Sequence, residues 1–255
     1  MGIKSKKFRG WTVSYLNEGE LDEMLKELYE KNYYQLNITQ PDPTIFDVGA
    51  LIGETVLFFK DKFPQAKIVA FEPSPRSFAL LKKNVSQNKL TQVKLINAAV
   101  VQKSGKTDFY ISKSNSEPWG RGDSLKIGRF NDKFQSKVVQ VSTVQLSSYM
   151  KGHIDLLKLD IEGAETEVIQ EIEPKLHLVR NIILEFHASP YNLENKLPTI
   201  LNILHRNGFK TKFYISQWPI PRFGVNIALI ILPLLKIDEF WIRVYATLQN
   251  RHSFH

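Results

Sequence analysis

The chain has 255 residues, no cysteine, 43% apolar residues and a formal net charge of +8. This length and apolar content suit one α/β domain with extensions. The lack of cysteine excludes disulfides, thiolate metal sites and cysteine nucleophiles, and it fits a cytoplasmic protein. The basic charge is compatible with anionic partners, but the lysines are scattered beyond the first ten residues, so a nucleic-acid partner is disfavoured.

Two segments bear on a membrane location. The basic N-terminus is not followed by the apolar stretch of ~7–15 residues that a secretory signal needs. The apolar segment 225–235 is shorter than the ~20 residues that span a bilayer, and Pro233 interrupts it. We therefore expect no transmembrane segment. The segment 225–235 is expected to be buried or to face a second subunit in a homodimer, and contact with a membrane surface or with a substrate is the alternative.

Residues 1–40 predict an N-terminal extension with a strand at 11–16 and a helix at 20–35. The remainder, 41–255, is expected to form one domain, interrupted by a polar loop at 113–133 and an apolar insertion at 218–236. Its predicted strands cover 44–49, 68–73, 93–100, 108–112, 137–144, 154–161, 181–187, 209–216 and 240–248. Its predicted helices cover 53–62, 75–88, 164–172 and 194–207. This alternation predicts a doubly wound α/β fold with a mostly parallel sheet, which binds ligands at the carboxyl ends of its strands.

The first strand-turn-helix of this domain carries a candidate cofactor site. The segment FDVGALIGETVLFF places Asp47, Gly49 and Gly53 in the order D-x-G-x-x-x-G. Gly49 permits a tight turn and the close approach of a ligand, and Gly53 opens a helix with free N–H groups. Dinucleotide-binding turns prefer G-x-G-x-x-G, and a carboxylate at Asp47 would repel a pyrophosphate. The same carboxylate can attract a sulfonium, so the pattern favours S-adenosylmethionine over a nicotinamide cofactor.

The second predicted strand of the domain supplies a candidate ribose ligand. Glu72 ends this strand 23 positions after Gly49. In doubly wound folds an acidic residue roughly 20 positions after the glycine turn binds the ribose. A carboxylate accepts hydrogen bonds from two vicinal hydroxyls at once, which suits Glu72 to this role.

Two later strands end in titratable residues. KLDIEGAE (158–165) places Asp160 at a strand end and Glu162 in the next turn, whereas Glu165 is expected only to complement the helix dipole. In NIILEFH (181–187), Glu185 and His187 alternate with an apolar residue and should share a face. A histidine beside a carboxylate suits general-base catalysis, which we favour over a structural histidine. A divalent metal held by Asp160, Glu185 and His187 is the third interpretation, and composition does not choose the ion.

The loop at 113–133 contains EPWGRGDS (117–124), a polar, glycine-rich segment with one tryptophan. Long loops inside compact domains often act as lids over a site. We therefore expect Trp119, Arg121 and Asp123 to cover the site or to contact the substrate.

Taken together, these residues resemble the FkbM family of methyltransferases over about 44–214. The resemblance rests on FDVGALIGE, AFEPSPRSFALLKKN, INAAV, LLKLDIEGAE and ILEFH, in this order and at fitting intervals. It implies a Rossmann-like class I methyltransferase whose sheet has seven strands, the last of them antiparallel. It also implies an S-adenosylmethionine-dependent enzyme, expected to methylate an oxygen on a small molecule such as a natural product, sugar or lipid. Leu51 departs from the family, which often has a small polar residue there, and this removes one side-chain contact to the cofactor.

The resemblance also assigns roles to individual residues. Asp47, Gly49 and Gly53 would hold the methionine part of the cofactor, and Glu72 its ribose. The adenine would lie beside Asn97 and Ala98. Asp160, Glu162 and His187 would face the acceptor, with Asp160 also touching the cofactor.

The expected reaction is an in-line transfer of the methyl group to an acceptor oxygen, with His187 as the base and Glu185 or Asp160 orienting it. A carboxylate acceptor needs no strong base, and His187 would then only position it. The alternatives are an RNA methyltransferase, a nicotinamide-dependent enzyme and a non-catalytic module that keeps the fold. The acceptor is expected to be selected by 1–40 and 217–255.

Overall fold

The structure is a computed structural model, and it describes residues 2–31, 33–34, 38–112, 123–125, 136–188, 194, 196–215, 218–220 and 240–249. Its helices are α1 (Glu18–Tyr29), α2 (Glu54–Lys62), α3 (Pro75–Gln87), α4 (Glu165–Ile172) and α5 (Leu197–Arg206). Its strands are β1 (Lys4–Phe8), β2 (Trp11–Tyr15), β3 (Thr44–Val48), β4 (Lys67–Phe71), β5 (Val93–Ile96), β6 (Ala99–Val100), β7 (Gly105–Ser112), β8 (Ser136–Val144), β9 (Ile154–Leu159), β10 (Val179–Ala188), β11 (Phe209–Ile215), β12 (Trp218–Ile220) and β13 (Phe240–Leu248).

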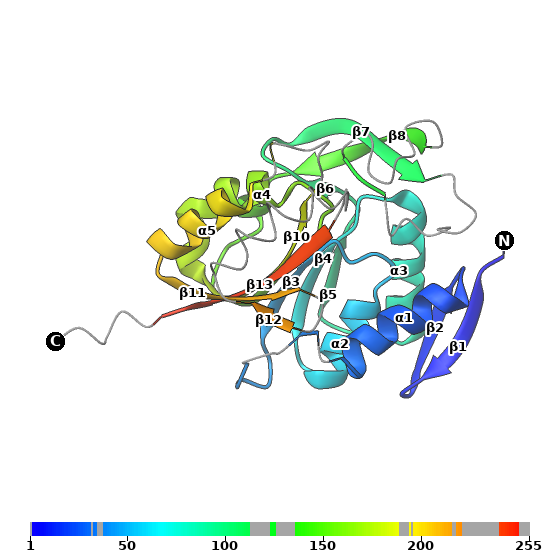
Figure 1. Cartoon of the computed structure of the whole chain (residues 1–255). Helices are drawn as coiled ribbons and strands as arrows, with labels where there is room; N and C mark the ends of the chain where they lie inside the picture. The colour runs from blue at the N-terminus through cyan, green and yellow to red at the C-terminus, as the bar shows by residue number, and fades with distance from the viewer. Residues whose placement is uncertain are drawn as a thin grey trace.

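A mostly parallel sheet forms the centre of the molecule, as Figure 1 shows. Its strand order is β12-β11-β13-β10-β9-β3-β4-β5, and β13 runs antiparallel to both β10 and β11. This confirms the doubly wound fold and its antiparallel last long strand. Within the described residues the sheet has eight strands in place of the seven expected, because β12 pairs with the edge of β11.

Each face of the sheet carries its own hydrophobic core, because successive side chains of a strand point to opposite faces. Leu156 and Ile183 pack with α2 and α3, whereas their neighbours Leu157 and Ile182 pack with α4 and α5. Figure 1 shows the same division, with α1, α2 and α3 on one side of the sheet and α4 and α5 on the other. The arrangement follows from the strands being apolar on both faces.

The segment 93–100, expected to be one strand, splits into two that belong to different sheets. β5 pairs with β4 at the edge of the main sheet, whereas β6 joins β8 and β7 in a three-stranded sheet. The chain turns between them at Asn97, whose amide donates to the backbone carbonyls of Glu72 (2.8 Å) and Pro73 (3.2 Å). This side chain ties the turn to the end of β4.

The N-terminal extension packs against the main sheet's helices. Strand β2, predicted at 11–16, pairs with a second strand, β1, which the sequence reasoning did not identify. Val13 and Leu21 pack with Ile52 and Leu80 in a small third core. No helix in the described part of the chain is long and apolar enough to cross a membrane.

Candidate active site

A cavity of about 340 Å³ lies at the carboxyl ends of the central strands. The strand order reverses between β3 and β9, which is where doubly wound folds bind their ligands. Residues from both ends of the chain and from all the predicted motifs line this cavity, among them Glu23, Glu27, Tyr33, Tyr34, Gly49, Glu54, Glu72, Ala98, Asp123, Lys158, Asp160, Glu162, Glu185, His187 and Arg243.

The turn after β3 brings its backbone against the end of β9. Gly49 has φ +87°, and a Cβ added there would lie 1.8 Å from the backbone oxygen of Asp160. Only glycine therefore fits at this position. The N–H groups of Gly49 and Ala50 both donate to the Phe71 carbonyl oxygen at 3.0 Å, which fixes the turn against β4.

Gly53 is glycine for a different reason. It is the N-cap of α2 with φ +91°, and a Cβ there would lie 2.7 Å from Leu81 Cδ1 on α3. Its lack of a side chain lets α2 pack closely on α3. The expected helix start is therefore confirmed, and the structure gives Gly53 a packing role besides its position near the turn.

Glu72 reaches the cavity from the end of β4, and two backbone N–H groups orient its carboxylate. Leu51 donates to Oε2 (2.9 Å) and Ser74 donates to Oε1 (2.8 Å). Burial raises the pKa of Glu72 to about 8, although these two hydrogen bonds oppose the shift. Ala98 lines the cavity nearby, whereas the Asn97 amide is engaged with backbone carbonyls of the β4 end.

A buried lysine links the turn to the acidic strand end, and the sequence reasoning did not single it out. Lys158 stands beside Asp47 in the register of β9 and β3, and its Nζ lies 3.3 Å from Asp47 Oδ1 and 3.6 Å from Asp160 Oδ2. It also donates to the Gly49 carbonyl oxygen. Burial alone would lower the pKa of Lys158, but the carboxylates of Asp47 and Asp160 outweigh it and raise that pKa well above the usual value.

Asp47, expected to hold the methionine part of the cofactor, is not among the residues that line the cavity. Its side chain is fully buried, accepts a hydrogen bond from the Thr55 hydroxyl and pairs with the Lys158 ammonium. A carboxylate buried beside an ammonium is neutralised by it. The structure therefore places Asp47 beneath the turn as the partner of Lys158.

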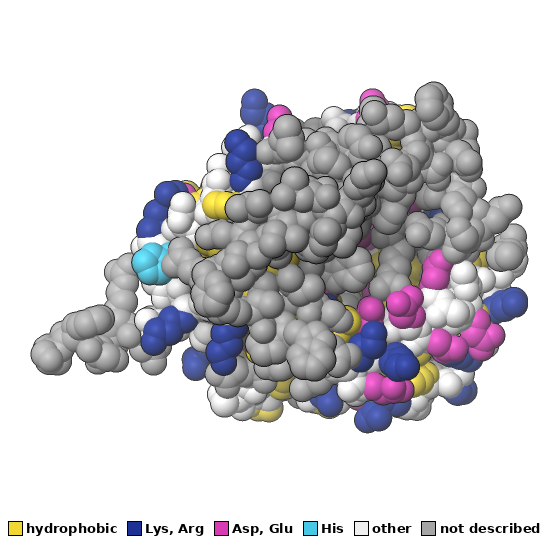
Figure 2. All heavy atoms as spheres, viewed as in Figure 1, with side chains coloured by type: hydrophobic (Ala, Val, Ile, Leu, Met, Phe, Trp, Pro, Cys, Tyr) yellow, Lys and Arg dark blue, Asp and Glu magenta, His cyan; other side chains and the backbone are white. Residues whose placement is uncertain are grey.

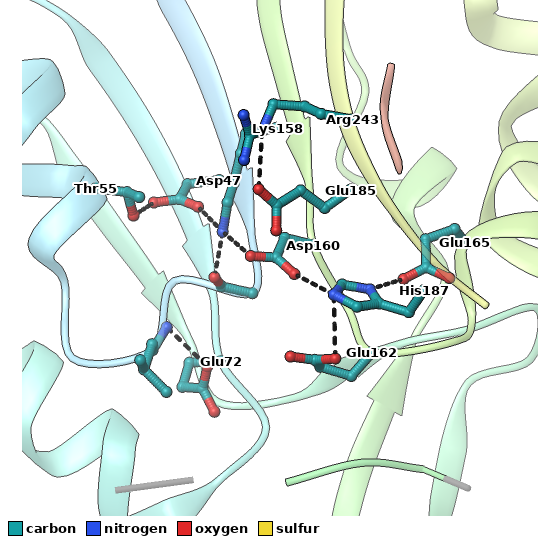
Figure 3. A network of polar contacts seen from close by, with 12 residues as sticks. Asp47, Thr55, Glu72, Lys158, Asp160, Glu162, Glu165, Glu185, His187 and Arg243 are labelled. Atoms are coloured by element: carbon teal, nitrogen blue, oxygen red, sulfur yellow. Dashed lines mark hydrogen bonds and ion pairs between the residues drawn. The ribbon is translucent and has the colours of Figure 1, made fainter. Parts of the chain in front are cut away.

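His187 is surrounded by carboxylates from three positions of the segment that follows β9 (Figure 3). Its Nε2 lies 3.3 Å from Glu162 Oε2 and 3.7 Å from Asp160 Oδ1. Its Nδ1 lies 2.9 Å from Oε1 of Glu165, a residue expected only to complement the helix dipole. The hydrogen-bond partner of Nδ1 is therefore Glu165, whereas the sequence suggested Glu185 or Asp160 as the partner of the ring.

Glu185 lies on the same face as His187, as the alternation predicted, and it pairs with Arg243. The two residues are register partners on β10 and β13, with Arg243 Nε 3.0 Å from Glu185 Oε1. The guanidinium also lies over the ring of Tyr33, 3.6 Å from its centroid. Arg243 of the last strand, packed on Tyr33 of the N-terminal extension, therefore holds the Glu185 carboxylate in place.

The three residues proposed as metal ligands do come together. One ligand atom each from Asp160, Glu185 and His187 lie within 4.8 Å of one another. However, Asp160 already has the Lys158 ammonium at 3.6 Å, and Glu185 has the Arg243 guanidinium at 3.0 Å. A divalent ion placed among them would be repelled by both cations.

Part of the loop at 113–133 reaches the cavity. Asp123 is buried and lines it, and the hydroxyl of Ser124 donates to the Glu162 carbonyl oxygen at 3.0 Å. Trp119 and Arg121, also expected to cover the site, lie outside the described residues, as does the apolar segment 225–235.

The doubly wound sheet, with a cavity at the carboxyl ends of its strands, is the fold of class I methyltransferases. Residues 47–211 match the family model described as the methyltransferase FkbM domain, and the chain belongs to this family. The family resemblance and the methyltransferase activity expected from the sequence are thereby confirmed. Membership of a methyltransferase family rules against the nicotinamide-dependent alternative.

Named relatives agree with this assignment. The chain is 30% identical over 236 residues to methyltransferase sdnD of Sordaria araneosa, covering 82% of this chain and 90% of that protein. It is 26% identical over 231 residues to the 31-O-demethyl-FK506 methyltransferase FkbM of Streptomyces tacrolimicus, covering 78% and 86%. The crystal structure of methyltransferase FkbM from Methylobacillus flagellatus matches with a TM-score of 0.50 at 12% identity, over 84% of this chain and 46% of that one. This last likeness shows the fold alone.

Proposed function

We propose that the enzyme transfers the methyl group of S-adenosylmethionine to a hydroxyl oxygen of a small-molecule acceptor, with His187 as the base. The observation that carries this proposal is the position of the His187 ring. It lines the same cavity as Gly49 and Glu72, and its Nε2 faces Asp160 and Glu162. A base and a cofactor turn that share one cavity are what a methyl transfer to oxygen requires.

The cofactor fits the part of the cavity formed by β3 and β4. The glycine turn at Gly49 leaves room for the methionine part, and the carboxylate of Glu72 would accept hydrogen bonds from the ribose hydroxyls. Its two backbone donors, Leu51 and Ser74, leave each oxygen a second lone pair for this purpose. Ala98 would lie beside the adenine. Asp47 would influence the cofactor only through its ion pair with Lys158, since its own carboxylate is buried beneath the turn.

The charges around His187 favour a hydroxyl acceptor over a carboxylate. Asp160 and Glu162 lie within 3.7 Å of Nε2, and these negative charges would repel an anionic acceptor. A hydroxyl has a proton to lose, whereas a carboxylate needs no base. His187 can therefore act as a base when the acceptor is an alcohol or a phenol.

We assign the selection of the methyl acceptor to residues of the N-terminal extension and of the last strand, β13. Glu23 and Glu27 are one turn apart on α1 and line the cavity together with Tyr33 and Arg243. Figure 2 shows acidic side chains gathered on the surface over α1. These four residues all lie outside the segment 47–211 that matches the family, which is where differences between acceptors are expected to reside.

The proposal is tested by replacing His187 with Gln and measuring the cofactor and the turnover separately. Calorimetric affinity for S-adenosylhomocysteine should stay within about 3-fold, because His187 lies on the acceptor side. Methyl transfer from labelled S-adenosylmethionine to a panel of neutral sugars and hydroxylated lipids should fall ~10²–10⁴-fold, the usual contribution of a general base. His177→Gln, an exposed histidine away from the cavity, is the matched control. Full turnover in His187→Gln, or a preference of the native enzyme for carboxylic acids over the alcohols, would refute the proposal.

A further inference from the structure

Glu165 contacts the His187 ring as well as standing at the N-terminus of α4. It is the first residue of α4, it is fully buried, and its Oε1 faces His187 Nδ1 at 2.9 Å. The same oxygen accepts the backbone N–H of Gly163 at 3.0 Å. Glu167 follows in the same helical turn and is half-buried, with its carboxylate accepting the backbone N–H of Gln102 at 2.8 Å. The helix end thus has a second carboxylate for its dipole, and Glu165 contacts the ring.

The chemistry of this contact fixes which ring nitrogen carries the proton. A carboxylate oxygen accepts hydrogen bonds. The backbone N–H of Gly163 donates to the same oxygen, so Oε1 of Glu165 is an acceptor in that contact as well. His187 Nδ1 must therefore be the donor, so that a neutral ring has its lone pair on Nε2.

We propose that Glu165 is a positioning residue that holds His187 in the Nδ1–H tautomer and aims the Nε2 lone pair at the acceptor. The inference rests on the proposed function of His187 as the base. Figure 3 shows the consequence for the ring, with Glu165 on its Nδ1 side and Asp160 and Glu162 on its Nε2 side. In the other tautomer, Nε2 would carry a hydrogen and could not take the acceptor's proton.

The same arrangement would also stabilise the positive charge that the reaction transfers to the His187 ring. The acceptor oxygen forms a bond to the methyl carbon, the carbon–sulfur bond breaks, and its electron pair stays on the sulfur as a neutral thioether. The hydroxyl proton goes to His187 Nε2. The positive charge therefore passes from the sulfonium to the imidazolium, which then lies between Glu165 on one side and Glu162 on the other. These carboxylates stabilise the charge where it appears.

The tautomer can be measured directly by nitrogen-15 NMR of ring-labelled histidine, with EDTA present so that no metal ion affects the signals. The ring signals of His187 are identified as those that disappear in His187→Gln. At a pH where this ring is neutral, the full-length native enzyme should show a protonated Nδ1 and an unprotonated Nε2. Glu165→Gln should shift the population towards Nε2–H, because a glutamine amide can donate to Nδ1. Glu167→Gln, with the same charge change at the same helix end, should leave the tautomer unchanged.

The activity of the same variants separates this inference from the proposed function. Glu165→Gln should lower kcat about 10- to 1000-fold while the S-adenosylhomocysteine affinity stays within about 3-fold, and Glu167→Gln should keep kcat within about 2-fold. A native ring in the Nε2–H form, or an unchanged tautomer in a folded Glu165→Gln, overturns the positioning role. A shifted tautomer with an unchanged kcat supports the positioning role and refutes His187 as the base. The measurement on the native enzyme decides the inference even where Glu165→Gln does not fold.

Discussion

Replacing Gly49 with alanine tests whether the turn after β3 must press against the end of β9. A non-glycine residue at φ +87° costs about 1–2 kcal/mol. The added Cβ would also stand 1.8 Å from the Asp160 backbone oxygen, so the two strand ends must separate until this distance exceeds 3.0 Å. That movement breaks or weakens the two hydrogen bonds from Gly49 and Ala50 to Phe71, each contributing about 0.5–1.5 kcal/mol. Together these terms amount to about 2–5 kcal/mol.

Gly10 supplies a control that separates the collision from the backbone strain. It has the same φ of +87°, and a Cβ there would meet nothing within 4 Å. Gly10→Ala should therefore lose only the strain of about 1–2 kcal/mol, and it should bind S-adenosylhomocysteine as the native enzyme does. Gly49→Ala should unfold at a clearly lower urea concentration than Gly10→Ala.

Calorimetry then tests whether Gly49→Ala also weakens the binding of S-adenosylhomocysteine. The displaced turn also carries the Leu51 N–H that orients Glu72. S-adenosylhomocysteine should therefore bind at least about 30-fold more weakly, which corresponds to about 2 kcal/mol. If Gly49→Ala matches Gly10→Ala in stability and keeps the native affinity, the close approach of the two strand ends is not a requirement of the site.

Two further predictions concern buried charge. Burial raises the pKa of Glu72 to about 8. Ribose hydroxyls would favour its ionised form, so cofactor binding should release a proton. The affinity for S-adenosylhomocysteine should therefore rise with pH up to about 8 and then level off, and Glu72→Gln should bind weakly with a flat profile across this range; an equal slope in both proteins would exclude Glu72 as the linked group. Lys158→Met should destabilise the fold by about 3–5 kcal/mol, because it leaves the Asp47 carboxylate buried without its cation. Adding Asp47→Asn should recover most of this loss in urea unfolding, whereas strict additivity of the two changes would show that they do not interact.

The parts of the site that the sequence predicted well are those built by neighbouring residues. The turn with Gly49 and the strand end with Glu72 each belong to one strand-turn segment, so their position follows from the local pattern. Glu185 and His187 share a face because they are two residues apart on one strand. These inferences need no knowledge of how distant strands pair.

The partners of the buried charges could not be predicted in the same way. Lys158 and Arg243 each interrupt an apolar strand, and a charge buried in a sheet needs a partner. The need is visible in the sequence, but the partners depend on register. Arg243 meets Glu185 across β10 and β13, and Lys158 meets Asp47 across β9 and β3, at sequence separations that no local pattern spans. The same holds for Tyr33, which contacts Arg243 from the other end of the chain.

Glu165 was misjudged for a related reason, which lies in the turn before it. A carboxylate in the first turn of a helix is usually solvated, and the sequence offers nothing to distinguish Glu165 from Glu167. In the structure, Glu162 and Gly163 both have positive φ, +61° and +105°, and a positive φ is uncommon for a glutamate. The chain therefore turns sharply between β9 and α4, and this turn places Glu162 on one side of the His187 ring and Glu165 on the other. Backbone strain that persists at such a point is characteristic of functional sites, and here it accompanies the placement of two carboxylates against the two nitrogens of the His187 ring.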